Sequence, residues 1–120
     1  MKKVIVTGGA GFIGSNLVKK LLDLNVEKLL IIDDLSTGNE SNISSILSDE
    51  RVHFLNSKIE DIESLNELFK DYDFCHHLAA GVGVQYIMDN LSDSLLTNIL
   101  ATHKVLEACQ ANELPVLLTS

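Results

Sequence analysis

Basic residues are scarce in this sequence of 120 residues. Nine lysines and arginines stand against 17 aspartates and glutamates, which gives a formal net charge of -8. A surface without a basic patch is poorly suited to nucleic acid, and negative charge repels anionic membranes. We therefore expect neither nucleic acid nor a membrane as a partner.

Long apolar runs and cysteines are also scarce. After Lys2 and Lys3 the first apolar run covers only 4–6, too short for a signal peptide or a membrane span. The two cysteines, Cys75 and Cys109, lie in apolar segments and form no CxxC pair, which indicates reduced, buried thiols. These features predict a cytoplasmic protein that starts at its mature N-terminus.

Short runs of aliphatic residues alternate with segments of helical period. Strands are expected at 4–6, 29–32, 52–55, 74–78 and 116–118. Helices are indicated by three sets of apolar positions: Ile13, Leu17, Leu21 and Leu24; Ile62, Leu65, Leu68 and Phe69; Leu95, Ile99, Leu106 and Cys109. Residues 35–50, rich in Ser, Asn and Gly, are expected to form a surface excursion with one helical turn at 43–47.

This alternation predicts the fold class α/β: a Rossmann-type, doubly wound parallel sheet in three layers, with strand order 3-2-1-4-5. The length of the chain allows one domain and no more. No internal repeat or low-complexity linker divides the sequence.

Glycines recur at positions 8, 11 and 14, directly after the first expected strand. Gly8 permits a tight turn, and Gly11 lets a diphosphate approach the backbone and the following helix N-terminus. Gly14 lets that helix pack closely on the sheet. A P-loop is excluded, because Ser15 and Asn16 follow Gly14 in place of GK[ST].

Asp33 ends the second expected strand, nineteen positions beyond Gly14. A ribose-binding carboxylate is expected about 20 residues after such glycines. Its charge would repel a 2′-phosphate, and no arginine follows in the next fifteen positions, so the pattern predicts NAD and not NADP. The alternatives are a glycine-rich turn without a ligand and a methyltransferase, which usually has a different glycine spacing.

Four segments resemble the extended short-chain dehydrogenase/reductase family: TGGAGFIG at 7–14, DDLSTG at 33–38, HLAA at 77–80 and LLTS at 117–120. The resemblance covers the whole chain and points to the NAD-dependent sugar-nucleotide epimerases, dehydratases and decarboxylases. It implies an enzyme that transiently oxidises a nucleotide-sugar hydroxyl and then returns the hydride to a keto-sugar intermediate. Residues 1–120 would be the N-terminal part of its NAD-binding Rossmann domain.

By this resemblance the cofactor-binding residues are Gly8, Gly11, Phe12, Ile13, Gly14, Asp33, Asp34, Leu35, Ser36, Gly38, Lys58, Ile59, Leu78, Ala79, Ala80 and Asn98. The family often has an adenine-binding aspartate where this chain has Lys58. We therefore expect Ile59 and backbone groups to contact the adenine. The glycine that the family has before the helix threonine, Thr102, is Ala101 here.

Family members continue after the fifth strand with a Ser/Thr-rich stretch and a YxxxK motif, whose tyrosine acts as acid and base. Thr119 and Ser120 resemble the opening of that stretch. Neither Tyr72 nor Tyr86 has a lysine four positions on. We therefore expect no catalytic residue in this chain, which alone would be inactive; the nucleotide-sugar substrate belongs to a longer parent.

Some residues invite other interpretations. His76 and His77 would lie on opposite faces of a strand, which argues against a shared metal ion. The loop at 81–85 is expected to form a flexible wall between nicotinamide and substrate.

The rival functions are a non-catalytic NAD(P)-binding sensor and an inactive excised fragment that self-associates through the edge strand 116–118. The resemblance also implies a homodimer through the helix at 95–109.

Overall fold

The computed structural model describes residues 2–79 and 91–119, and of residues 91–98 the backbone only. Its strands are β1 (Lys3–Thr7), β2 (Lys28–Asp33), β3 (Val52–Asn56), β4 (Phe74–His77) and β5 (Val116–Leu118). Its helices are α1 (Phe12–Asp23), α2 (Leu65–Phe69) and α4 (Leu91–Ala111), with 3₁₀ turns η1 (Glu40–Asn42), η2 (Ser44–Ile46) and η3 (Ile59–Asp61).

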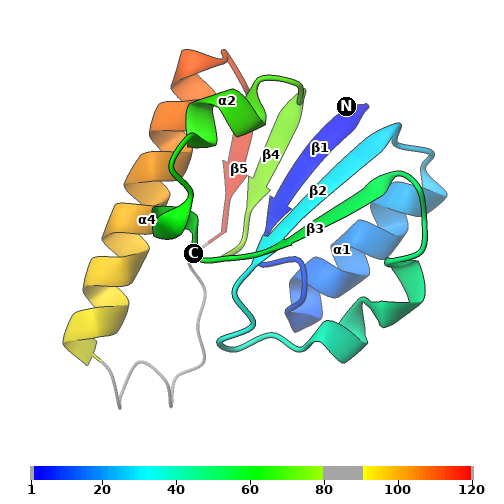
Figure 1. Ribbon diagram of the computed structural model, residues 1–120, viewed down its shortest axis with the longest axis horizontal. Coiled ribbons are helices and arrows are strands. Elements are labelled where there is room, and N and C mark those ends of the chain that lie inside the picture. The colour runs from blue at the N-terminus through cyan, green and yellow to red at the C-terminus, as the bar shows by residue number, and fades with distance from the viewer. Residues whose placement is uncertain (1, 80–90, 120) are drawn as a thin grey trace.

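The strands form one parallel sheet in the order β3-β2-β1-β4-β5, which confirms the predicted topology. Thr7, the last residue of β1, pairs with Ile32 on one side and with His77 on the other. The carboxyl ends of the three central strands therefore meet at one edge of the sheet, where the glycine segment begins (Figure 1).

Helices cover both faces of the sheet: α1 lies on one face, and α2 and α4 lie on the other (Figure 1). Successive residues of β2 alternate between the two cores, with Leu29 and Ile31 against α1 and with Leu30 and Ile32 against the opposite layer. A strand buried on both faces has no polar side, which explains its unbroken apolar sequence.

The buried face of α1 differs from the predicted one. Ile13 and Leu24 are 68% and 64% exposed, so they do not belong to the core. The buried residues of the helix are Gly14, Ser15, Val18, Leu21 and Leu22. The reason is steric: α1 approaches the turn at Gly8 so closely that its smallest residue must face inward.

The buried face of α4 also differs from the predicted one. Ile99 and Leu106 are 57% and 38% exposed, although both stand in the predicted stripe. The core side of the helix is made of smaller residues, Ala101, Val105, Ala108 and Cys109. Leu95 is a position whose side chain lies outside the description. Among the described residues, no helix is both long and apolar enough to span a membrane.

Two further segments differ from the prediction. The predicted stripe that begins at Ile62 forms a helix only from Leu65, because Ile62 ends η3. The excursion after β2 contains two separate 3₁₀ turns in place of one helical turn.

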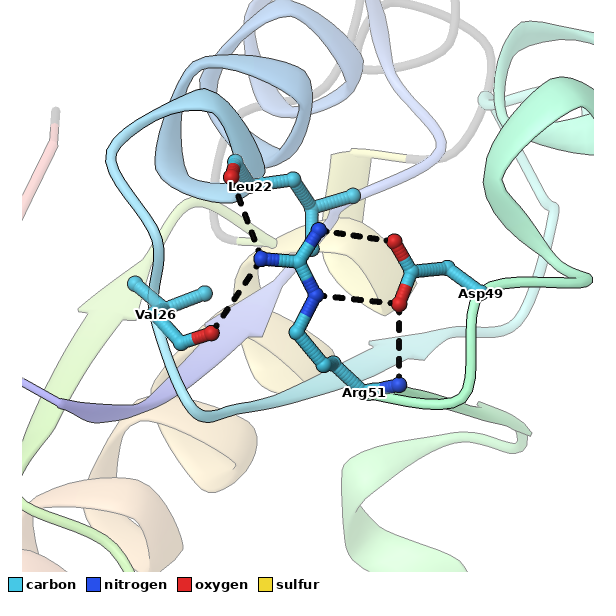
Figure 2. Close-up of polar contacts among 4 residues, drawn as sticks. All are labelled: Leu22, Val26, Asp49 and Arg51. Atoms are coloured by element: carbon cyan, nitrogen blue, oxygen red, sulfur yellow. Dashed lines mark hydrogen bonds and ion pairs between the residues drawn. The ribbon is translucent and has the colours of Figure 1, made fainter.

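Arg51 fastens the end of α1 to the start of β3, at the edge of the sheet opposite the glycines (Figure 2). Its Nη1 donates to the carbonyl oxygens of Leu22 and Val26, at 3.2 and 3.4 Å. Its Nε and Nη2 donate to the two carboxylate oxygens of Asp49, at 3.0 and 2.8 Å. A cation at a helix C-terminus offsets the partial negative charge of the last carbonyls. The hydrogen bonds from Arg51 lower the pKa of Asp49 to about 2.

Substituting Asp49→Asn should therefore lower the urea midpoint of unfolding at pH 6. The pKa of Asp49 in the folded chain lies below its ordinary value of 3.8. The stabilisation is thus complete above that value and is lost as the pH falls toward 2. Urea titrations at pH 6 and pH 2.5 should show a difference between the variant and the unmutated chain that shrinks at the lower pH. Glu50→Gln, an exposed neighbour, is the control; an unchanged midpoint of Asp49→Asn at pH 6 would contradict the prediction.

Candidate functional site

The chain leaves β1 through a tight turn at Gly8, whose φ is 76°. Its amide donates to the Ile32 carbonyl at 2.8 Å, which holds the turn against β2. On the other side, a Cβ at Gly8 would stand 2.9 Å from the amide nitrogen of Ala79. Only glycine combines this backbone angle with this close approach to the end of β4.

No side chain of the described residues caps the N-terminus of α1. Gly11 precedes the helix with extended backbone, without a side-chain cap, and the first turn contains no acidic residue. A Cβ at Gly11 would meet only the Gly8 carbonyl oxygen, at 3.4 Å, so the space beside this residue is open. The first amides of a helix have no partner within it and carry partial positive charge. Phe12 and Ile13 flank this end as exposed apolar side chains.

Gly14 explains how α1 comes so close to the turn. A Cβ at this position would collide with the carbonyl oxygen of Gly8. The sequence predicted a close contact here but placed it on the sheet, whereas the partner is the turn itself. The contact fixes the direction in which the helix N-terminus points.

The carboxylate of Asp33 turns toward the glycine loop and is nearly buried. Its Oδ2 accepts from the Ala10 amide at 2.9 Å, and its Oδ1 accepts from the Leu35 amide at 2.8 Å. Each oxygen keeps one further lone pair, so the carboxylate can still accept two hydrogen bonds. Asp33 therefore both holds the loop and remains available to hydroxyl groups.

The segment after β2 packs on the same loop. Asp34 accepts from the Ser36 amide at 3.0 Å, and Leu35 has a φ of 63°. A Cβ at Gly38 would stand 2.9 Å from the Ala10 carbonyl group. The predicted residues between Asp33 and Gly38 thus lie together beside the glycine turn.

Two asparagines that sequence reasoning missed complete this packing. The Ala10 carbonyl accepts from the Asn39 amide at 3.1 Å and from the Asn42 side chain at 2.8 Å. Asn39 also accepts from the Ser41 amide and so caps η1. This capping position is the one local signal by which the sequence could have indicated Asn39.

The end of β3 borders Asp33, because the Ser57 amide donates to the Asp33 carbonyl at 3.2 Å. Lys58 is exposed, whereas the Ile59 side chain is buried in the core under α4. Any ligand contact at Ile59 would thus involve its backbone. Lys104 of α4, a residue that sequence reasoning missed, donates to the carbonyls of Ile59, Glu60 and Ile62 at 3.4, 3.2 and 2.9 Å.

At the end of β4, the Thr7 hydroxyl oxygen lies 3.0 and 3.2 Å from the amides of Leu78 and Ala79. It also lies 2.6 Å from Nδ1 of His77, whose Nε2 lies 2.9 Å from the Thr102 hydroxyl. Thr7 and His77 are fully buried. Burial lowers the pKa of His77 to about 4, so its imidazole is neutral at pH 7. Sequence analysis considered His77 individually only as a metal ligand and did not single out Thr7.

Several predicted residues lie outside the described ones: Ala80, the loop at 81–85, Ser120 and, in its side chain, Asn98. Thr119 is described, and its amide lies 3.4 Å from the His77 carbonyl oxygen. No three His, Cys, Asp or Glu side chains of the described residues gather as metal ligands would.

The family model described as GDP-mannose 4,6 dehydratase matches residues 5–118. A putative UDP-glucose 4-epimerase from Methanocaldococcus jannaschii is 37% identical over 105 residues, which is 87% of this chain and 32% of that protein. The dTDP-glucose 4,6-dehydratase of Neisseria meningitidis is 33% identical over 114 residues, 92% of this chain and 32% of that protein. The chain thus spans about a third of the length of these relatives.

Solved structures of an epimerase and a dehydratase are also similar to this chain. The epimerase Mth375 from Methanothermobacter thermautotrophicus is 38% identical with a TM-score of 0.86, over 99% of this chain and 35% of that one. The dTDP-glucose 4,6-dehydratase DesIV from Streptomyces venezuelae, solved with NAD and TYD bound, is 30% identical with a TM-score of 0.84. That match covers 93% of this chain and 37% of DesIV.

Alanine substitutions at Gly11 and Gly14 should lower the stability of the fold by different amounts. Gly14→Ala should lower the free energy of unfolding by about 3 kcal/mol, because its methyl group would collide with the Gly8 carbonyl. Gly11→Ala should cost no more than about 1 kcal/mol, because its backbone angles suit any residue and its methyl group has room. Urea unfolding curves of both variants test this. Equal losses would show that the close contact at Gly14 does not determine the helix position.

Proposed function

This chain belongs to the GDP-mannose 4,6 dehydratase family, among the extended short-chain dehydrogenases/reductases, and we propose that it binds NAD at the carboxyl ends of its strands. The observation that carries the proposal is the 2.9 Å hydrogen bond between the Ala10 amide and the Asp33 carboxylate. This bond brings a bare helix N-terminus and a carboxylate with spare lone pairs to opposite sides of one peptide. NAD carries a diphosphate and, next to it, the ribose diol of the adenosine.

The diphosphate would bind at the N-terminus of α1. The unpartnered first amides and the helix dipole favour an anion there. The open side of Gly11 gives the phosphate oxygens access to these amides, and Phe12 and Ile13 would be covered by the ligand. No acidic side chain of the first turn competes with an anion.

The adenosine would lie over the end of β2. The two spare lone pairs of Asp33 would accept from both ribose hydroxyls, and the segment from Asp34 to Gly38 would line that side. The adenine would lie near the backbone of Lys58 and Ile59, since the Ile59 side chain is used in the core.

The charges of the chain favour NAD over NADP. A 2′-phosphate would meet the Asp33 carboxylate and would need a cationic partner. The one arginine of the sequence, Arg51, lies at the opposite edge of the sheet in its ion pair with Asp49. It is therefore not available to a phosphate beside Asp33.

The nicotinamide end would lie against Leu78 and Ala79, together with Ala80 and Asn98 by resemblance. Thr7 fixes the backbone of the first two residues through their amides. When bound, NAD supplies a hydride acceptor for oxidation of a hydroxyl group. The described residues bind and orient it, and we assign no proton transfer to them.

For a complete protein of which this chain would be the NAD-binding part, we propose a nucleotide-sugar epimerase or dehydratase. The supporting relatives are a putative epimerase and dehydratases, and the dehydratase DesIV was solved with NAD and TYD bound. A transient keto sugar is the intermediate that allows both kinds of reaction. Residues outside the 120 would select the sugar and move the proton.

The unmutated chain should bind NAD more tightly than NADP in a fluorescence or calorimetric titration. Asp33→Asn should weaken NAD about tenfold or more, because a charged acceptor of ribose hydroxyls is lost, and should weaken NADP less. Asp71→Asn, the same charge change at the opposite edge, is the matched control. Tighter binding of NADP by the unmutated chain would refute the assignment, as would an unchanged preference in Asp33→Asn.

Gly11→Ala should fold and fail to bind. Its methyl group would occupy the open space through which the diphosphate reaches the first amides of α1. We expect NAD affinity to fall at least about 100-fold while the unfolding curve moves little. Ala108→Gly, in the core on the opposite face of the sheet, tests the specificity of this effect, since it should lower stability and leave NAD affinity unchanged. NAD binding by Gly11→Ala at the unmutated affinity would exclude the diphosphate from this position.

A further inference from the structure

A chain of polar groups, buried at its centre and partly exposed at its two ends, runs from the end of β4 to the middle of α4. Its members are the amides of Leu78 and Ala79, the Thr7 hydroxyl, the His77 imidazole and the Thr102 hydroxyl. Thr7 and His77 have no exposed surface, so water does not compete for these groups. Their protons must therefore be shared among the members themselves.

The Thr7 hydroxyl has three neighbours within hydrogen-bond distance, and its one proton can go to only one of them. The amides of Leu78 and Ala79 can only donate, the first of them also to the Thr7 carbonyl oxygen at 3.0 Å, so neither can accept the proton of the hydroxyl. The proton of the hydroxyl then points to Nδ1 of His77, 2.6 Å away. Nδ1 must accept and so carries no proton.

This assignment fixes the state of the imidazole. A neutral histidine without a proton on Nδ1 carries it on Nε2. Nε2 lies 2.9 Å from the Thr102 hydroxyl oxygen and donates to it. Each of these groups therefore donates to the next one, from the β4 amides through Thr7 and His77 to Thr102 in α4.

The chain of hydrogen bonds ends where the cofactor site begins. Leu78 and Ala79 stand against the turn at Gly8, with 2.9 Å between the Ala79 nitrogen and the position of a Gly8 Cβ. A change at Thr102 would alter the proton on His77, then the orientation of the Thr7 hydroxyl, and then the two amides.

We propose that His77 is a positioning residue, held as the Nε2–H tautomer by Thr7 and Thr102, that couples α4 to the nicotinamide side of the NAD site. The proposal rests on the proposed function, because NAD is the ligand whose binding reports the coupling. It assigns Thr102, a residue without a role in cofactor contact, an influence on cofactor affinity.

The test compares Thr102→Val, which removes the acceptor but keeps the shape, with Thr102→Ser, which keeps the hydroxyl. In the unmutated chain, ¹⁵N spectra of the His77 ring at pH 7 should show a protonated Nε2 and a bare Nδ1. Thr102→Val should disturb this signature and weaken NAD about five- to tenfold, the effect of losing one buried hydrogen bond. Thr102→Ser should restore both the spectrum and the affinity.

A destabilised control separates positioning from general loss of stability. Ala108→Gly lies on the core side of the same helix, away from the hydrogen-bond chain, and should lower the urea midpoint while leaving NAD affinity and the His77 spectrum unchanged. A protonated Nδ1 in the unmutated chain would overturn the tautomer and the proposal. Unchanged affinity in Thr102→Val, or an equal loss in Ala108→Gly, would overturn the coupling. Failure of the unmutated chain to bind NAD would instead overturn the proposed function, and with it the positioning role, whatever the spectrum shows.

Discussion

The geometry of the candidate site depends on the hydrogen bonds of the Ala10 backbone. Its amide is bound by the Asp33 carboxylate, and its carbonyl is bound by Asn39 and Asn42. The turn after β1 is thereby fixed to the segment after β2 on both of its polar sides. A buried amide without an acceptor costs about 1–3 kcal/mol, so the loop has one strongly preferred position. The direction of the α1 N-terminus follows from that position, because Gly14 packs on the same turn.

The sheet could be predicted from the sequence because its signals are local. Strands covered on both faces are apolar throughout, and their alternation with helices in a parallel fold leaves few possible orders. The helix faces could not be predicted in the same way. Periodicity records which residues are apolar, whereas the inward side of α1 is decided by how close the backbone comes. Gly14 and Ser15 are therefore buried, and the larger Ile13 is left exposed.

Within the candidate site, the glycines and Asp33 were predictable because their spacing reflects a local turn and one crossover. Their partners were not. The contact between Thr7 and His77 joins residues 70 positions apart, and that between Lys104 and Ile62 joins residues 42 apart. Threonine, histidine and lysine occur at many positions, and no local pattern indicates which of them will meet. The double use of Asp33, as acceptor for the loop and as a candidate acceptor for ribose, also required the structure.

The two edges of the sheet use their polar groups differently, and this difference argues for the location of the site. At the amino ends of the strands, charged side chains satisfy backbone groups: Arg51 binds the carbonyls of Leu22 and Val26, and Asp73 accepts from the amides at Lys2 and Lys3. At the carboxyl ends, the polar side chains bind loop backbone but leave the first amides of α1 without a cap. Open donors are what an anion needs, so this difference favours the carboxyl ends of the strands as the place of the proposed diphosphate site.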